Sequence, residues 1–154
     1  MTWSIRPLAA ADFDTWCHLW RAYLAFYQTT LAEDIYDVTF SRLIAPDHPA
    51  QNAFVAVIDG NIAGLVHYIY HPHNWRHEDV CYLQDLFVKP AYRCAGVGSG
   101  LISMLSFTLL MPMTRLASIG YPKISITRPT SFLAGSRPSR HLSNIPAKTG
   151  FYWP

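Results

Sequence analysis

The spacing of apolar residues predicts short strands and helices along the first hundred residues. Between residues 10 and 27, apolar and aromatic side chains recur every three or four positions, which is typical of a helix. A second helix is predicted for residues 32–44, and it ends before Pro46, because a proline disfavours helical backbone at the residue preceding it. Strands are predicted at residues 3–7, 53–58, 62–70 and 80–88. Asp59-Gly60-Asn61 favours a hairpin turn between the second and third of these strands.

The order of these elements predicts one domain of the mixed α+β class. A strand, two helices and three strands precede a glycine-rich turn and an apolar helix, and strands joined by short turns pair antiparallel. We therefore expect a β-α-α-β-β-β-α core with a largely antiparallel central sheet. A chain of 154 residues suits a single domain over residues 1–154. No apolar run reaches the roughly 18–20 residues of a membrane span, so no membrane partner is expected.

Charge is distributed unevenly along the chain, although the formal net charge is only +2. Residues 1–85 carry four basic and all ten acidic residues, whereas residues 86–154 carry eight basic and no acidic residues. The basic residues after position 102 are dispersed and match no recognised nucleic-acid-binding motif. Nucleic acid is therefore not expected as a partner.

The cysteines and histidines do not suggest a metal site. Cys17, Cys81 and Cys94 are odd in number and not in paired spacing, which predicts free thiols in a reducing cytoplasm. Histidines cluster at residues 67–77, but His71-Pro72-His73 is a poor chelate without a carboxylate or thiol at helical spacing. We expect a surface loop there and no metal.

The segment that carries chemistry follows the last predicted strand and runs from residue 92 to residue 100. It reads Tyr-Arg-Cys-Ala-Gly-Val-Gly-Ser-Gly. Glycines let backbone amides approach a ligand closely, and a helix that begins here offers unpaired N–H groups and a positive dipole. The segment predicts either a phosphate or pyrophosphate site, to which Arg93 adds charge, or simply a flexible turn before a helix. No Gly-Lys-Ser/Thr or later acidic residue follows, which excludes a Walker loop and disfavours a Rossmann turn.

Residues 82–98 resemble the acetyl-CoA-binding signature of the GNAT N-acetyltransferase superfamily. The run Tyr-Leu-Gln-Asp-Leu-Phe-Val at residues 82–88 and Arg-x-x-Gly-x-Gly at residues 93–98 carry this resemblance, which covers about residues 3–102. The run is most similar to the histone/polyamine, spermidine/spermine-like branch. The resemblance implies a cytoplasmic enzyme that transfers an acetyl group from acetyl-CoA to a primary amine, either a small amine, a polyamine or a peptidyl amine. The sequence leaves open whether the protein forms a homodimer.

The resemblance also implies roles for individual residues. Asp85 is a candidate base or base relay, or else a structural acid, because alternation along a strand leaves its direction open. Cofactor contacts are implied for Leu86, Phe87 and Val88 along the pantetheine and for Arg93, Cys94, Ala95, Gly96, Val97, Gly98 and Ser99 around the pyrophosphate. Acceptor contacts are implied for Tyr23, Tyr27 and Glu33.

Three positions depart from the family pattern. Cys94 replaces the usual first glycine of the loop, and Ser99 replaces a residue that is commonly basic. Gln84 stands where polyamine-acetylating relatives often carry Glu, and an amide cannot act as a base.

The family pattern stops near residue 102, and residues 103–154 form an atypical segment rich in Ser, Pro and Arg. Pro112 lies inside the expected helix and should break it, and the Leu-Tyr that often supplies the general acid is missing. A shifted reading frame permits the family pattern across residues 104–126, so we hypothesise that residues 103 to about 145 are out of frame. The alternative is a divergent tail with a short helix at residues 101–110 and a strand at residues 121–126.

The sequence therefore leaves two functions open. One is an N-acetyltransferase, impaired if its C-terminal half is lost. The other is a non-catalytic acyl-CoA-binding or interaction domain that keeps the loop and lacks the acid tyrosine.

Overall fold

The computed structural model describes residues 2–75, 77–109 and 126–127. Its elements follow in the order β1 (Thr2–Pro7), a short 3-10 helix (Ala10–Asp12), α1 (Phe13–Phe26), α2 (Glu33–Ile44), β2 (Gln51–Ile58), β3 (Asn61–His71), β4 (Val80–Val88), a second 3-10 helix (Pro90–Tyr92), α3 (Val97–Leu109) and β5 (Ile126–Thr127). The predicted β-α-α-β-β-β-α core is confirmed. No helix of the described part is both long and apolar enough to span a bilayer.

The strands form one sheet in the order β4-β3-β2-β1-β5, with antiparallel pairing between neighbours. β5 lies beyond β1, at the edge farthest from β4. In the described part of the chain, β3 is the only strand that pairs with β4. Among the described residues, the other side of β4 is therefore an edge of the sheet, where backbone groups can bind a partner.

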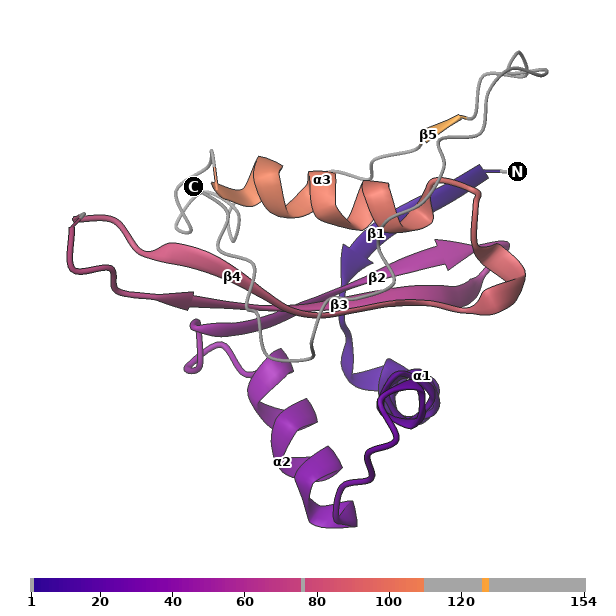
Figure 1. Ribbon diagram of the computed structural model, residues 1–154, viewed down its shortest axis with the longest axis horizontal. Helices are drawn as coiled ribbons and strands as arrows, with labels where there is room; N and C mark the ends of the chain where they lie inside the picture. Colours follow the sequence, from indigo (N-terminus) through magenta and orange to yellow (C-terminus); the bar gives the residue numbers. More distant parts are fainter. Residues whose placement is uncertain (1, 76, 110–125, 128–154) are drawn as a thin grey trace.

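Helices cover both faces of this sheet: α1 and α2 lie on one face and α3 on the other (Figure 1). The strands can serve two cores because successive side chains point to opposite faces. On β2, Phe54 and Ile58 belong to the core under α3, and Val55 belongs to the core under α1 and α2. Leu101 and Met104 of α3 are fully buried against the sheet, and each buried side chain of this size stabilises the fold by about 1.5–3 kcal/mol.

Helix α3 continues past residue 102, the expected end of the family pattern, and ends at Leu109. The proposed frame shift falls mainly on residues 110–125 and 128 to about 145, and most of the alternative strand at 121–126 falls on residues 121–125. These residues lie outside those that the structure describes. The hypothesis remains a prediction. Transcript reads over codons 100–130 test it, and an uninterrupted frame there would refute it.

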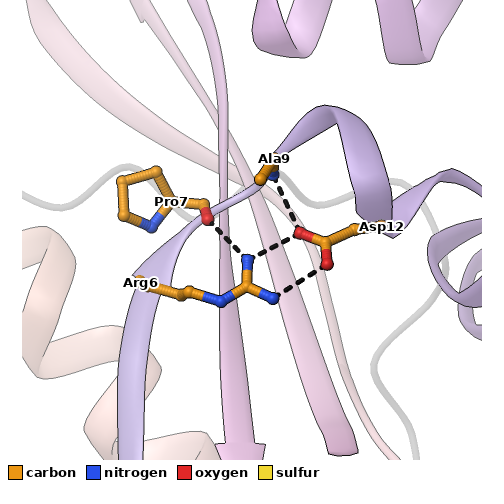
Figure 2. A network of polar contacts seen from close by, with 4 residues as sticks. All are labelled: Arg6, Pro7, Ala9 and Asp12. Atoms are coloured by element: carbon orange, nitrogen blue, oxygen red, sulfur yellow. Dashed lines mark hydrogen bonds and ion pairs between the residues drawn. The ribbon is translucent and has the colours of Figure 1, made fainter.

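An ion pair fixes the turn between β1 and α1 (Figure 2). Arg6 donates from Nη1 to Asp12 Oδ2 at 2.6 Å and from Nη2 to Oδ1 at 2.8 Å. The Ala9 N–H also donates to Oδ2, at 2.8 Å. The hydrogen bonds from Arg6 are the main reason that the pKa of the Asp12 carboxyl lies below its ordinary value, although burial opposes this shift.

We expect Asp12→Asn to lower the free energy of unfolding by about 1 kcal/mol at neutral pH, because the Arg6 side chain is 39% exposed and water screens the pair. Since the pKa is lower in the folded state, the stabilisation is present above the unfolded-state value of about 3.9 and is lost as pH falls through the folded-state value. Urea unfolding at neutral pH and near pH 3 measures this change, with the exposed Asp47→Asn as control. An equal loss at both pH values would contradict the ion-pair explanation.

Candidate functional site

A β-bulge in β4 determines the direction of Asp85. β3 and β4 pair His67 with Asp85 but Tyr68 with Leu83, so Gln84 is an extra residue on β4. Because side chains alternate along a strand, the extra residue places Asp85 on the face opposite Leu83. Leu83 packs against the core under α3, whereas Asp85 contacts His67 and α1 on the other side. The bulge thus settles the direction that alternation alone left open.

Asp85 belongs to a buried chain of hydrogen bonds. Its Oδ2 lies 2.8 Å from His67 Nδ1 and accepts a hydrogen bond from Trp20 Nε1 at 3.2 Å. On the far side of the imidazole, Trp16 Nε1 donates to His67 Nε2 at 2.8 Å. Asp85 is 7% exposed and His67 is 4% exposed. The carboxylate is therefore held from two sides by groups on β3 and α1.

Three members of this chain, Trp16, Trp20 and His67, are functional candidates that the sequence did not single out. Trp16 and Trp20 are four residues apart, which places them on one face of α1, and this spacing predicts packing. Their contact with His67 and Asp85 depends on how α1 lies over β3 and β4. No signal in the sequence gives that placement.

Tyr23 and Tyr27, two of the predicted acceptor residues, extend this cluster along α1. Burial raises the pKa of Tyr23 far above its ordinary value, and the nearby Asp85 carboxylate adds to the increase. The Tyr23 ring lies edge-on to Tyr27, with centroids 5.0 Å apart, and 6.5 Å from Phe87 of β4. Tyr27 is 48% exposed. The two tyrosines therefore join the surface of the molecule to the region of the buried carboxylate.

Glu33, the third predicted acceptor residue, has a different environment. It begins α2 and accepts a hydrogen bond from Arg21 at 2.5 Å, with its side chain 79% exposed. The Arg21 guanidinium also lies over the Tyr36 ring at 4.6 Å. The structure thus brings Tyr23 and Tyr27 together and places Glu33 in a surface ion pair.

The glycine-rich segment turns from β4 into α3 through two residues with left-handed backbone. Cys94 has φ 61° and Gly96 has φ 79°. A Cβ built on Gly96 would meet no atom within 4 Å, so this side of the loop is open. α3 begins at Val97, and the N–H groups of its first turn lack partners within the helix. Open backbone and a helix N-terminus together fit an anionic group.

The other predicted cofactor residues divide between loop and core. Ala95 packs against the core under α3, and the Val97 side chain is 1% exposed within it. A Cβ on Gly98 would lie 3.8 Å from Val88 Cγ2, an ordinary contact. The Ser99 carbonyl accepts a hydrogen bond from the Ser103 hydroxyl at 2.9 Å. A ligand at this loop would therefore be held by backbone groups more than by side chains.

Cys94 occupies a backbone conformation that favours glycine. Left-handed backbone costs a residue with a Cβ about 1 kcal/mol or more. We expect Cys94→Gly to raise the free energy of unfolding by about 0.5–1 kcal/mol, since glycine removes this strain but gains freedom in the unfolded chain. Cys94→Ala is the matched control, because alanine keeps the strain and should leave the stability unchanged. Urea unfolding measures both, and equal effects of the two substitutions would contradict the explanation.

Backbone direction shows which residues of β4 face its open edge. Lys89 N–H donates to the Ala63 carbonyl of β3 at 2.9 Å. Backbone groups of successive residues in a strand point to opposite sides. The N–H and C=O of Phe87 therefore also point toward β3, and those of Leu86 and Val88 point away from it. The Val88 carbonyl accepts a hydrogen bond from Arg93 Nε at 3.1 Å. Arg93 therefore lies at the junction of the open edge and the glycine-rich loop.

The predicted histidine loop lies at the other end of the β3–β4 hairpin from the glycine-rich loop (Figure 1). A shallow hollow of about 300 Å³ lies there, lined by His71, Pro72, His73, Asn74 and Trp75. Within the described residues, no three His, Cys, Asp or Glu side chains lie close enough to hold a metal ion. All three cysteines are free thiols, with Cys17 and Cys81 buried and Cys94 exposed.

Known structures share this architecture. A ribosomal-protein-alanine N-acetyltransferase from Brucella melitensis biovar Abortus 2308 superposes with a TM-score of 0.59 at 21% identity, over 70% of this chain and 72% of that chain. A possible acetyltransferase from Clostridium difficile 630 gives a TM-score of 0.63 at 14% identity, over 88% and 100%. AAC(6')-Iy, in complex with the bisubstrate analogue CoA-S-monomethyl-acetylneamine, superposes with a TM-score of 0.60 at 16% identity, over 88% of this chain and 99% of that chain. These likenesses concern the fold.

The sequence comparisons agree and also correct one expectation. The D-amino-acid N-acetyltransferase HPA3 of Saccharomyces cerevisiae is 30% identical over 102 residues, which are 66% of this chain and 63% of that protein. The chain thus spans less than two thirds of the length of this curated relative. The expected placement in the histone/polyamine branch is not supported, because this relative is named as a D-amino-acid N-acetyltransferase. The model of the acetyltransferase (GNAT) family matches residues 13–108, and the chain therefore belongs to the GNAT acetyltransferase family.

Proposed function

We propose that this protein is an acetyl-CoA-dependent N-acetyltransferase of primary amines. One observation carries the proposal: the open edge of β4 runs directly into the left-handed loop and the N-terminus of α3, and Asp85 lies on the same strand. The three free cysteines favour a reducing, cytoplasmic setting.

The edge and the loop would hold the two parts of acetyl-CoA. Leu86 and Val88 offer backbone groups along the open edge of β4, where a pantetheine amide would bind like an added strand. Phe87 would hold this part of β4 in place, because its ring is buried in the core under α1 and α2. The loop from Arg93 to Ser99 would hold the pyrophosphate through amides at the start of α3. Acetyl-CoA supplies the activated acetyl thioester.

Acetyl transfer requires a neutral amine, and Asp85 is the proposed proton acceptor for it. Asp85 lies on β4 close to the edge where the thioester would bind, and it receives the proton directly or through one bridging hydroxyl or water. The Tyr23 hydroxyl on α1 could be this bridge, since it lies close enough for the Asp85 carboxylate to contribute to the raised pKa of Tyr23. A backbone N–H of β4 would stabilise the oxyanion.

The acceptor amine would enter along Tyr23 and Tyr27. The rings of these residues form an aromatic surface with Phe26, which is 72% exposed. The ring centroids of Phe26 and Tyr27 lie 5.2 Å apart. Aromatic faces attract ammonium groups. The acceptors to test first are a polyamine, a peptide with a free amine and, because of the yeast relative, a D-amino acid.

Binding of acetyl-CoA tests the loop, and the chain offers a matched control. Gly96 and Gly60 both have φ 79° and open space at Cβ, but Gly60 lies in the β2–β3 turn. We expect Gly96→Ala to weaken acetyl-CoA binding about tenfold, because it strains the loop backbone that holds the pyrophosphate. Gly60→Ala introduces similar strain and should leave binding unchanged.

Isothermal titration with acetyl-CoA and thiol release with the three acceptors are the measurements. Absence of binding at millimolar acetyl-CoA by the folded protein would refute the proposal. Binding without turnover of any acceptor would favour the alternative of a non-catalytic acyl-CoA-binding domain.

A further inference from the structure

The hydrogen bonds around His67 fix the position of its proton. An indole N–H can donate but cannot accept a hydrogen bond. Because Trp16 Nε1 lies 2.8 Å from His67 Nε2, Nε2 must be the accepting nitrogen. The proton of the neutral imidazole is then on Nδ1, which donates to Asp85 Oδ2 at 2.8 Å. His67 is thus held in one tautomer by a donor on α1.

We propose that His67 and Trp16 are positioning residues that keep Asp85 ready to accept the proton of the acceptor amine. This inference deepens the proposed function and rests on it. His67 and Trp20 both donate to Oδ2 of Asp85, which fixes the orientation of the carboxylate. Trp16 occupies the second nitrogen of His67, so that the arriving proton goes to the carboxylate and not to the imidazole.

The reaction balances with Asp85 as the first proton acceptor. The acceptor ammonium gives one proton to the Asp85 carboxylate, which becomes a neutral carboxylic acid, and the electron pair stays on nitrogen. The nitrogen pair then forms the C–N bond to the acetyl carbonyl, and the C–S pair leaves with sulfur. The second nitrogen proton converts the CoA thiolate into the thiol. Asp85 later returns its proton to solvent, and His67 keeps its Nδ1 proton throughout.

Among the described residues, the titratable groups around this carboxylate come from β3, α1 and α2. His67 approaches from β3 and Tyr23 from α1, with Tyr27 behind Tyr23. From α2, Tyr36 packs edge-on against both indoles and carries the Arg21 guanidinium over its ring. Helix α3 lies on the opposite face of the sheet (Figure 1). A change in the activity of the His67 and Trp16 variants can therefore be assigned to this cluster.

Variants at position 67 separate positioning from mere packing. His67→Leu removes the donor to Asp85, so the carboxylate loses its fixed orientation. We expect kcat to fall about 10- to 100-fold, with KM for the acceptor little changed. His67→Asn keeps a donor near the place of Nδ1 and should recover most of the loss in kcat. The exposed His48→Asn is the control, and acetyl-CoA affinity should be unchanged in all three variants.

A second measurement does not depend on activity. Nitrogen-15 spectra of the full chain should show His67 with a protonated Nδ1 and an unprotonated Nε2 at neutral pH. In Trp16→Phe, which keeps a ring but removes the N–H, this tautomer should no longer be fixed. An Nε2-protonated or doubly protonated His67 in the native protein would overturn the inference. A folded His67→Leu with the kcat of the native protein would overturn it as well, whereas a lack of acetyl-CoA binding refutes the proposed function itself.

Discussion

We expect Asp85→Asn to lower kcat/KM for acetyl transfer by about 100-fold or more, because an amide cannot accept the proton of the acceptor amine. The fold should be retained. Both donors in the cluster, His67 Nδ1 and Trp20 Nε1, bond to the same oxygen of Asp85. The carbonyl oxygen of asparagine can take that position and accept from both. A loss of activity without a loss of stability is therefore due to the missing negative charge and basicity of the carboxylate, and not to its structural role.

The controls for Asp85→Asn follow from the same contacts. Asp85→Ala leaves two buried donors without an acceptor and should also lower the free energy of unfolding, by about 1–3 kcal/mol per donor. The exposed Asp79→Asn removes the same charge just before β4 and should change neither property. Steady-state kinetics and urea unfolding measure the three variants. Near-native turnover by a folded Asp85→Asn would show that Asp85 is a structural acid.

We expect Gly100→Ala to lower the free energy of unfolding by about 2–3 kcal/mol. Gly100 lies in the first turns of α3, where it faces the indole of Trp3 on β1. A Cβ at this position would overlap Trp3 Cη2 and lie 2.8 Å from Cζ3. Trp3 is only 4% exposed and packs in the core under α3, so its ring has little room to move. The clash outweighs the better helix propensity of alanine.

Two variants check that the clash is the cause. Gly98→Ala adds the same methyl group two residues earlier, where the nearest atom is Val88 Cγ2 at 3.8 Å, and it should not destabilise the protein. The double variant Trp3→Phe with Gly100→Ala should lose less stability than the two single effects added together, because phenylalanine lacks the atoms that collide. Urea unfolding of the four proteins gives the coupling energy. Strict additivity would place the cause elsewhere.

Much of the fold follows from local patterns. The three-and-four spacing of aromatic residues predicted α1, and the Asp-Gly-Asn turn predicted the β2–β3 hairpin. β4 was predicted with the bounds that the structure shows, Val80–Val88. Other boundaries differ by a few residues. β2 begins at Gln51 and β3 spans Asn61–His71; the first predicted helix begins with a separate 3-10 helix, and α3 begins at Val97, within the expected turn. Helix ends depend on single hydrogen bonds, such as the Ala9 N–H to Asp12, which spacing does not encode.

The glycine-rich loop was also readable in the sequence, because Gly96 marks a backbone geometry that most residues avoid. The same signal is hidden at position 94, where a cysteine occupies left-handed backbone. Only the φ of Cys94 shows that it has taken a glycine position. The glycine pattern thus identified the loop as a candidate cofactor site but could not show the backbone strain at Cys94.

The sequence by itself determined the family, the order of the elements and the place of the loop, since these depend on patterns between near neighbours along the chain. The tertiary structure decided the direction of Asp85 and its partners. One extra residue in the pairing of β3 and β4, Gln84, turns the carboxylate toward α1, and the packing of α1 brings Trp16 and Trp20 to it. A register shift and a helix placement are contacts between distant residues, so no local pattern specifies them.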